Sequence, residues 1–394
     1  MLVLTTLSAA ALAGWLWLLL GRHGFWLARP VIEREPLPVR ADWPEVVAIV
    51  PARNEAAHVG QALETLLGQD YPGRFRIILV DDHSDDETWA IGEALAAAAP
   101  HRLEVIGAAP LRPDWSGKLW ALECGLRHLD ERPPLIWFTD ADIGHHPSAL
   151  RRLVAKAEAE RRDLVSVMVR LNLETPVERL LIPPFIFFFQ MLYPFPAVND
   201  PGSPVAAAAG GSALVRRAAL DATGGLAPIR HRLIDDVALA GAIKRAPAGA
   251  GRIWLGHGIL EQSLRRYDGL GEVWRMVARS ADEQLGHSPA MLALTVIGMS
   301  VLYLVPVLAA VLWPVHGGAP AGLLGLATFA LTMLAYGPTA RLYRLGWTWR
   351  LTLPLAAALF LGMTLDSARR FRQQGGGVWK GRVQAPVEPK DTPR

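Results

Sequence analysis

Residues 45–82 read EVVAIVPARNEAAHVGQALETLLGQDYPGRFRIILVDD and decide the class of fold. A β-branched run at 45–51 ends in proline. Apolar residues recur at helical spacing over 59–67, and a second apolar run at 76–80 ends in acidic residues. Continuous apolar runs that alternate with an amphipathic helix are typical of parallel strands buried on both faces. The stretch therefore predicts the first strand, helix and strand of an α/β fold.

The same alternation continues through the first half of the chain. We expect helices at 88–98 and 117–129, and strands at 102–106, 134–139 and 164–169. Asn54 is a candidate cap for the first helix, and Ser84 with Glu87 has the spacing of a capping box for the second. This order predicts a mainly parallel sheet with helices on both faces, in which ligands bind beyond the carboxyl ends of the strands.

Acidic residues follow two of the expected strands. Asp81 and Asp82 end one strand, and Asp140 and Asp142 flank a single residue after another. Two such carboxylates repel each other unless a cation lies between them, and Mg²⁺ or Mn²⁺ prefers oxygen ligands and bridges to diphosphate. The plainer alternative is that one aspartate caps the next turn and the other is solvated. The position at a strand end favours a site.

Asp235 and Asp236 form a second acidic pair before an apolar helical run. A helix N-terminus favours negative charge, but one carboxylate would be enough for that. The alternative is a general base, which accepts a proton from an attacking hydroxyl. His145 and His146 precede Pro147 and are typical of a turn, while His257 is a secondary candidate for a metal ligand.

Two common nucleotide sites are excluded. The turn after the first strand, PARNEAAH at 51–58, has no glycine, so it is not a dinucleotide fingerprint. Gly117 and Lys118 are followed by Leu119, so they do not form a P-loop. The chain has 394 residues and a net charge of +3, with scattered arginines and no basic block, which argues against nucleic acid. Its single cysteine excludes an intrachain disulfide.

Both ends of the chain are apolar. Residues 2–20 carry no charge and are long enough to span a bilayer. Arginines follow but none precedes, so we expect an uncleaved anchor with the following chain in the cytoplasm; a cleaved signal peptide would need a basic start. Further apolar segments occupy 291–313, 320–336 and 351–365. The last is short, and spanning would place a basic tail outside, so we expect a re-entrant or interfacial segment.

Residues 181–198 are apolar and aromatic but contain four prolines. Proline at this density argues against a plain spanning helix. Two interpretations stay open, namely a segment buried in the core and a helix that lies in the membrane interface.

Five segments in order resemble the motifs of the family 2 inverting glycosyltransferases of GT-A fold. They are VVAIVPARNEAAHVGQALETLLGQDYPGRFRIILVDDHSDDET (46–88), PDWSGKLWAL (113–122), FTDADIGHHP (138–147), GGSALVRRAALDATGGL (210–226) and IDDVALAGAIKR (234–245). The resemblance spans roughly residues 45–285. It implies a glycosyltransferase with a UDP-sugar donor, a divalent metal and an α/β GT-A domain.

The resemblance also implies a role for each matched residue. Pro51 and Glu55 would shape the nucleotide pocket, Asp81 and Asp82 would contact the uridine, Lys118 would lie near the donor, Asp140 and Asp142 would hold the diphosphate and metal, and Asp236 would be the base. Gly210, Gly211, Ser212, Asp235 and Arg279 would lie on the acceptor or diphosphate side. The implied layout is an anchor at 1–27, a GT-A domain at 40–285, transmembrane segments at 290–366 and a basic tail at 367–394.

One departure from the family pattern narrows the range of acceptors. Many membrane members end this domain with QxxRW, whereas here Met276 and Ser280 replace the glutamine and tryptophan and only Arg279 is kept. That argues against a processive polymer synthase. RMVAR at 275–279 and VWKGR at 378–382 are most similar to the hopene-associated glycosyltransferases of bacteria, and next to ceramide- and carotenoid-glycosylating relatives. They imply a lipid acceptor and a multi-pass protein of the bacterial inner membrane with a cytoplasmic catalytic domain.

Two other hypotheses stay open. The acceptor could be a polyprenyl phosphate or a growing polysaccharide; a phosphate would need extra basic residues near Asp236, and Arg230, His231 and Arg232 are close in sequence. The chain could also be a membrane scaffold with an inactive transferase domain. Decay would remove the acidic motifs first, and they are all present, which argues against a scaffold.

Overall fold

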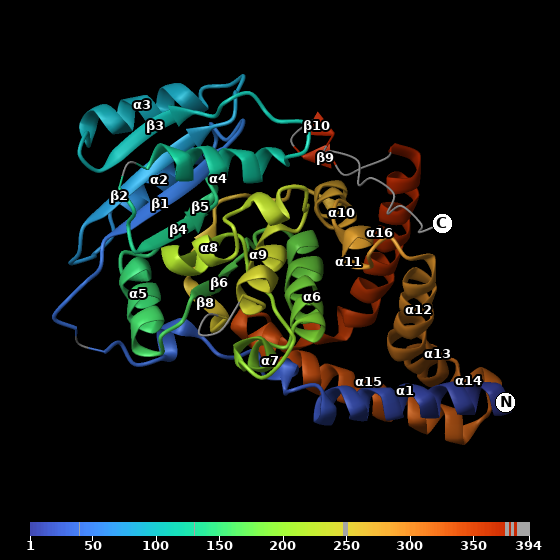
Figure 1. Ribbon diagram of the computed structural model, residues 1–394. Coiled ribbons are helices and arrows are strands. Elements are labelled where there is room, and N and C mark those ends of the chain that lie inside the picture. The colour runs from blue at the N-terminus through green and yellow to red at the C-terminus, as the bar shows by residue number, and fades with distance from the viewer. Residues whose placement is uncertain (39, 130, 247–250, 375–377, 380–381, 384–394) are drawn as a thin grey trace, which may run out of the picture. The chain divides into compact units, whose positions relative to one another are not determined.

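The structure is a computed structural model that describes residues 1–38, 40–129, 131–246, 251–374, 378–379 and 382–383 (Figure 1). The contacts divide the chain into two units. Unit 1 contains residues 1–29, 172–196 and 266–373, and unit 2 contains the described residues of 30–171, 197–265 and those from 374 onward. Most of the predicted basic tail, including 384–394, lies outside the described residues. The predicted boundaries at 1–27, 40–285 and 290–366 stay a prediction.

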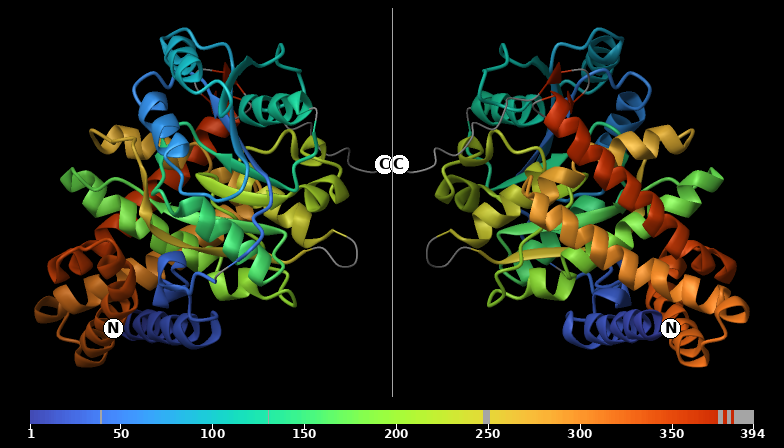
Figure 2. Two further views of the ribbon diagram at one scale, coloured as in Figure 1. Left: turned by 90° about the vertical axis from the view of Figure 1, so that its left-hand side faces the viewer. Right: turned by 90° about the vertical axis from the view of Figure 1, so that its right-hand side faces the viewer.

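Unit 2 is built on a single large sheet. Within the described residues its eight strands are β1 (Val46–Ala52), β2 (Phe75–Asp81), β3 (Leu103–Gly107), β4 (Leu135–Thr139), β5 (Ile143–Gly144), β6 (Leu164–Arg170), β7 (Ser212–Arg216) and β8 (Ile253–Ser263). They lie in the order β3-β2-β1-β4-β7-β6-β8-β5. Figure 2 shows from two sides how these strands twist across unit 2. A short hairpin, β9 (Val378–Trp379) and β10 (Arg382–Val383), is separate.

The sheet is mixed rather than uniformly parallel. Strands β3, β2, β1 and β4 are parallel, as the sequence predicts, and so are β6 and β8. Strand β7 runs antiparallel to both β4 and β6, and β5 runs antiparallel to β8. The sequence signal for β7 is only the short run SALVR, which lies inside a motif. The α/β GT-A class is confirmed, with this second half of the sheet as the difference.

Helices cover both faces of the sheet. They are α2 (Val59–Leu67), α3 (Thr88–Ala98), α4 (Gly117–His128), α5 (Ala149–Ala159), α8 (Arg217–Ala222) and α9 (Asp235–Lys244), with a 3₁₀ turn at Ala227–Ile229; α7 (Phe195–Asn199) spans the boundary between the units in sequence. Every residue of β1 is buried, which requires cover on both sides. A Cβ added at Gly125 of α4 would lie 2.6 Å from Ile49 of β1, so glycine allows this close approach.

The polar residues predicted as helix caps have another use. Helix α2 begins after His58 and α3 after Glu87, and neither start has a side-chain cap. Asn54 Oδ1 instead accepts from the backbone N of Asp85, and Ser84 Oγ accepts from the backbone N of Asn54. Both capping predictions are therefore wrong, because these side chains connect the loop after β1 to the loop after β2.

Unit 1 is helical. Its elements are α1 (Leu2–Gly21), α6 (Pro176–Leu192), α10 (Leu270–Ala278), α11 (Ala281–Gln284), α12 (Pro289–Met299), α13 (Val305–Val311), α14 (Trp313–His316), α15 (Ala319–Leu342) and α16 (Leu353–Gln374), with a π-helical turn at Ser300–Leu304 and 3₁₀ turns at Phe25–Leu27 and Trp347–Thr352. Among the described residues, four helical segments are long and apolar enough to cross a membrane, at Leu2–Gly21, Pro289–Val311, Ala319–Leu342 and Trp347–Gln373. Helix α1 packs along α15 (Figure 1).

Two predictions for unit 1 can be compared with the structure. The last apolar segment continues as helix to Gln374, well beyond the expected 365, so its length no longer argues for a re-entrant path. The basic residues that follow residue 365 still argue for a re-entrant path. Residues 176–192 form a continuous helix despite Pro183 and Pro184, and both prolines are buried. Helix α6 therefore has the contacts of the core-segment interpretation, with Phe187 and Phe188 in the apolar centre of unit 1.

Candidate active site

Lys118 lies among carboxylates at the carboxyl edge of the sheet. Its Nζ is 2.8 Å from Asp140 Oδ1 and 3.2 Å from Asp235 Oδ2. Lys118 is in the first turn of α4, Asp140 directly follows β4, and Asp235 begins α9. The fold thus brings together three charges that are far apart in the sequence. The cleft at this point is also lined by Pro51, Gly210 and Asp236.

Asp236 is fixed by two backbone donors. Its Oδ2 accepts from the backbone N of Gly210 at 2.8 Å, and its Oδ1 accepts from Val237 N at 2.7 Å. A Cβ at position 210 would lie 3.2 Å from Lys118 Nζ and 3.4 Å from Asp236 Oδ2, so glycine leaves this space to the polar groups. Neither Asp235 nor Asp236 acts as a side-chain N-cap of α9, and the cap alternative is not observed.

The charges in this cluster do not balance. One lysine faces the three carboxylates of Asp140, Asp235 and Asp236. Burial raises the pKa of Asp236 to about 7, the Asp235 carboxylate adds to the rise, and Lys118 opposes it. Burial also raises the pKa of Asp140, against the effect of Lys118. A carboxylate whose pKa lies near neutrality is suited to accept a proton from an attacking group.

Burial disfavours the charge of Lys118, but the neighbouring carboxylates have the opposite and larger effect. Asp140 and Asp235 together raise the pKa of Lys118 above its ordinary value. The ammonium group is therefore a fixed positive charge at any pH at which the protein is handled. It offsets part of the negative charge and can hold an anionic ligand at the strand ends.

A second polar group joins Asp142 to Glu55 through Arg265. Arg265 Nε lies 2.8 Å from Asp142 Oδ2, and its Nη2 lies 2.8 and 2.9 Å from the two carboxylate oxygens of Glu55. The backbone also fixes this loop, since Leu264 N donates to the carbonyl of Asp142 at 2.7 Å. Sequence reasoning missed Arg265, because a lone arginine after a strand carries no recognisable motif.

The loops after β1 and β2 hold Asp81 and Asp82. Asp81 Oδ2 accepts from the backbone N of Ser84 at 3.0 Å, and the Ser84 hydroxyl also donates to Asp81. Asp82 is buried, with 1% of its surface exposed, and its N donates to the carbonyl of Ala52. Asp81 and Asp82 therefore lie at the predicted edge of the sheet, where neighbouring loop residues contact them.

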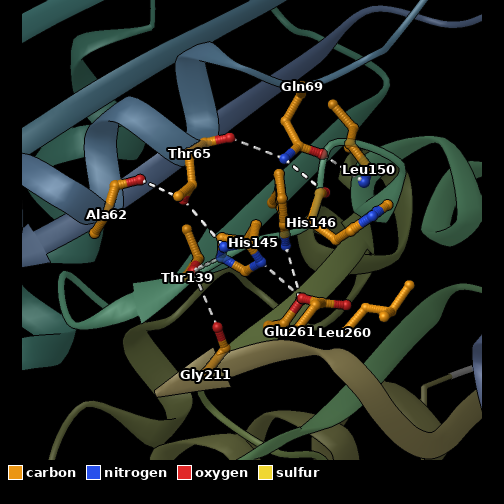
Figure 3. Close-up of polar contacts among 12 residues, drawn as sticks. Ala62, Thr65, Gln69, Thr139, His145, His146, Leu150, Gly211, Leu260 and Glu261 are labelled. Atoms are coloured by element: carbon orange, nitrogen blue, oxygen red, sulfur yellow. Dashed lines mark hydrogen bonds and ion pairs between the residues drawn. The ribbon is translucent and has the colours of Figure 1, made fainter. Parts of the chain in front are cut away.

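His145 belongs to a buried network close to the same edge (Figure 3). Its Nδ1 lies 2.7 Å from Glu261 Oε2 on β8, and its Nε2 lies 2.7 Å from Thr139 Oγ1. The Thr139 hydroxyl donates to the carbonyl of Gly211, so Nε2 donates to Thr139 and one proton lies between Nδ1 and Glu261. The pair has no net charge. His145 is thus more than the turn residue that the sequence predicts.

Four further residues that the sequence offered as site candidates lie outside the Lys118 cluster. Gly211 accepts from Thr139, and Ser212 Oγ accepts from Trp137 Nε1 at 3.1 Å, so both are structural neighbours of β4. Arg279 directly follows α10 in unit 1 and is exposed. His257 is buried on β8, and burial lowers its pKa to about 3.

The residues at this edge fit a divalent cation in their chemistry. Asp140 and Asp142 offer the oxygen ligands that Mg²⁺ and Mn²⁺ prefer, and the negative charge exceeds the positive charge around Lys118. In the described part of the chain, no group of three or more His, Cys, Asp or Glu side chains is placed to hold a metal, so His257 does not complete such a group. A bound diphosphate would have to supply the remaining ligands.

Comparison with known proteins identifies the domain that carries Lys118, Asp140 and Asp142. Residues 47–224 match the family described as Glycosyl transferase family 2. They form a glycosyl transferase family 2 domain. The match contains strands β1 to β7, β1 from its second residue, together with Lys118, Asp140 and Asp142. Asp235, Asp236 and Arg265 lie beyond it in sequence. The prediction of a glycosyltransferase domain is confirmed, while the match does not distinguish the hopene-associated group.

Two curated proteins resemble part of the chain. The beta-monoglucosyldiacylglycerol synthase of Synechocystis sp. is 35% identical over 115 residues, 28% of this chain and 22% of that protein. The undecaprenyl-phosphate 4-deoxy-4-formamido-L-arabinose transferase of Shewanella sediminis is 35% identical over 136 residues, 34% of this chain and 39% of that protein. The matches thus cover about a fifth and about two fifths of these relatives.

A solved structure resembles nearly the whole chain. The mannosyltransferase PcManGT from Pyrobaculum calidifontis, in complex with GDP-Man and Mn²⁺, has a TM-score of 0.59 over 92% of this chain and 99% of its own. The sequences are 22% identical. At that identity the likeness supports the GT-A-like fold of the family 2 domain.

Proposed function

We propose that the chain is a membrane glycosyltransferase that moves one sugar from a UDP-sugar to a lipid acceptor with inversion. The observation that carries the proposal is the cluster of Lys118, Asp140, Asp235 and Asp236 at the carboxyl edge of a family 2 domain. The four long apolar helices of the described chain would hold the protein in the membrane. A bacterial inner membrane and a cytoplasmic domain follow from the charge pattern and the family resemblance.

The proposed reaction needs a base and a stabilised leaving group. The Asp236 carboxylate takes the proton of the acceptor hydroxyl while that oxygen bonds to the anomeric carbon. The bond from this carbon to the diphosphate oxygen breaks, and a nucleoside diphosphate leaves on the opposite face. Lys118 offsets negative charge on the donor side, and Glu55, Asp81 and Asp82 bind the nucleotide. A divalent cation held by Asp140 and Asp142 would supply Lewis-acid stabilisation of the departing diphosphate.

A lipid acceptor is supported by two relatives and by the helices. One relative is named for a glucosyldiacylglycerol and the other for an undecaprenyl phosphate. A hopanoid-type lipid is the finest part of the proposal and rests on the resemblance of residues 275–279 and 378–382. We place Gly210 and Asp235, which line the cleft, on the acceptor or diphosphate side, to which the resemblance also assigns Gly211, Ser212 and Arg279.

A polyprenyl phosphate is the second candidate because of the undecaprenyl-phosphate relative. Such an acceptor needs a cation near Asp236. Arg230 follows the end of a short 3₁₀ turn, and its Nε lies 2.7 Å from Asp114 Oδ2 while its Nη1 donates to the carbonyl of Ala227. Since these contacts engage Arg230, a neutral lipid is the acceptor that we favour.

The test is nucleoside diphosphate release by the full chain purified in detergent. UDP- and GDP-sugars are supplied with Mg²⁺ or Mn²⁺, with and without bacterial neutral lipids or polyprenyl phosphate. We expect release that requires one UDP-sugar, a metal and a neutral lipid. Asp142→Ala should lose metal-dependent binding of UDP. Release with polyprenyl phosphate alone would select the second candidate, and absence of both nucleotide binding and release would reject the proposal.

A further inference from the structure

Arg265 occupies an unusual place for a residue outside every predicted motif. It lies two residues beyond the end of β8, with about a third of its side chain exposed. Its guanidinium connects Asp142, which follows β4, to Glu55, which follows β1. These are the strands whose carboxyl ends lie side by side at the centre of the sheet.

The arginine sits between carboxylates rather than beside one. Glu55 and Asp142 are mostly buried, with 11% and 16% of their side chains exposed, and both use the same guanidinium. A single positive group between two buried carboxylates replaces the cation that such a pair requires. A guanidinium fork also binds phosphate oxygens in the same bidentate way as carboxylate oxygens.

We propose that Arg265 is a diphosphate-binding residue of the donor site, and that in the nucleotide-free chain it acts as an internal cation that competes with the divalent metal for Asp142. The inference rests on the proposed function. When metal and donor bind together, Arg265 leaves Asp142 and donates to a diphosphate oxygen. Its contact with Glu55 limits how far it moves, and its partial exposure leaves room for the change.

A purely structural role predicts something different. An arginine that only connects two loops would, when removed, weaken metal binding and nucleotide binding together. An internal competitor has opposite effects on the two, because its removal leaves Asp142 available to the metal and deprives the diphosphate of a donor. The sign of the two changes therefore separates the interpretations.

The experiment uses the full chain in detergent with Arg265→Gln, Arg265→Lys and the matched control Arg266→Gln. Arg266 is the next residue, exposed and paired with Glu174 at 2.8 Å. Binding of Mn²⁺ alone is followed by electron paramagnetic resonance, and binding of UDP and of GDP with Mn²⁺ by calorimetry. For Arg265→Gln we expect Mn²⁺ affinity to rise about tenfold and nucleotide affinity to fall about tenfold. Arg266→Gln should change neither.

The lysine variant keeps the proposal testable if the glutamine variant does not fold. Lysine retains the charge but not the fork, so Arg265→Lys should lose nucleotide affinity while Mn²⁺ affinity stays close to that of wild type. A parallel fall of both affinities, or no change in either, would overturn the role of Arg265. A wild-type chain that binds neither Mn²⁺ nor nucleotide would instead reject the proposed function, and this inference with it.

Discussion

Two polar groups lie close together in unit 2, one partly exposed around Lys118 and one buried around His145, and they differ in how their charges are balanced. Around Lys118 one cation faces three carboxylates, and burial, together with the neighbouring carboxylates, raises the pKa values of Asp140 and Asp236 against the effect of Lys118. Around His145 a histidine and a glutamate share one proton, and Thr139 satisfies the other ring nitrogen (Figure 3). The first group can therefore bind a ligand or accept a proton, whereas the hydrogen bonds of the second are satisfied without a ligand.

The strongest test of this comparison is Asp236→Asn. The amide keeps the shape, and its single oxygen can accept from Gly210 although not from Val237 as well, but it cannot take a proton. We expect the rate of sugar transfer to fall by about 10²–10⁴-fold, with UDP affinity nearly unchanged. Nucleoside diphosphate release with lipid acceptor measures the rate. Asp221→Asn, at an exposed aspartate of α8 paired with Arg217, is the control and should leave the rate unaltered.

A rate for Asp236→Asn close to that of wild type would remove Asp236 as the base. The contrast between the two groups would then lose its functional meaning.

The second test concerns the group around His145, in which the charges balance. Glu261→Ala leaves the buried His145 ring without its partner, and we expect a loss of about 3 kcal/mol in the free energy of unfolding. Glu261→Gln can still hydrogen-bond to Nδ1, so its loss should be clearly smaller. Thermal unfolding of the detergent-purified chain measures both. Equal melting temperatures for wild type and Glu261→Ala would show that the network does not stabilise unit 2.

The third test asks whether the excess negative charge around Lys118 lowers the stability of the folded chain. The pKa of Asp236 is raised from 3.8 to about 7 in the folded chain, so the folded state binds the proton more tightly than the unfolded state. Between these values stability must fall as pH rises. Asparagine does not titrate, so Asp236→Asn should be more stable than wild type at pH 8 by on the order of 1–2 kcal/mol. The difference should shrink toward pH 4.

Melting temperatures from pH 4 to pH 8 measure this difference. A variant that is less stable than wild type at every pH would contradict it, and would place Asp236 with the structural residues.

The sequence predicted the parallel half of the sheet well because its strands and helices alternate with clear periods. It located β1, β2, β3, β4 and β6, and the acidic residues that follow β2 and β4. It did not predict the antiparallel β7, whose five residues have no period of their own. Asn54 and Ser84 were misassigned as caps, since a capping pattern and a loop-to-loop hydrogen bond use the same residue types.

In the candidate site, the sequence identified the carboxylates but not their partners. The resemblance placed Lys118, Asp140 and Asp236 in one site, and the structure brings them together. Arg265 and Glu261 lie more than a hundred residues from Asp142 and His145, and nothing in a linear pattern relates them. Long-range pairing is a property of the fold, so it requires coordinates.

The place of β7 has a consequence for how the protein is made. In the sheet, β7 lies between β4 and β6. In the sequence it begins only at Ser212, so the ribosome makes it after β4, β6 and the apolar helix α6. At roughly 5–20 residues per second, β4 and β6 wait several seconds with unpaired backbone edges. Such edges invite pairing with another chain. Until β7 closes the gap, the nascent protein exposes these edges to other chains, and expression should be sensitive to changes in the 212–216 segment.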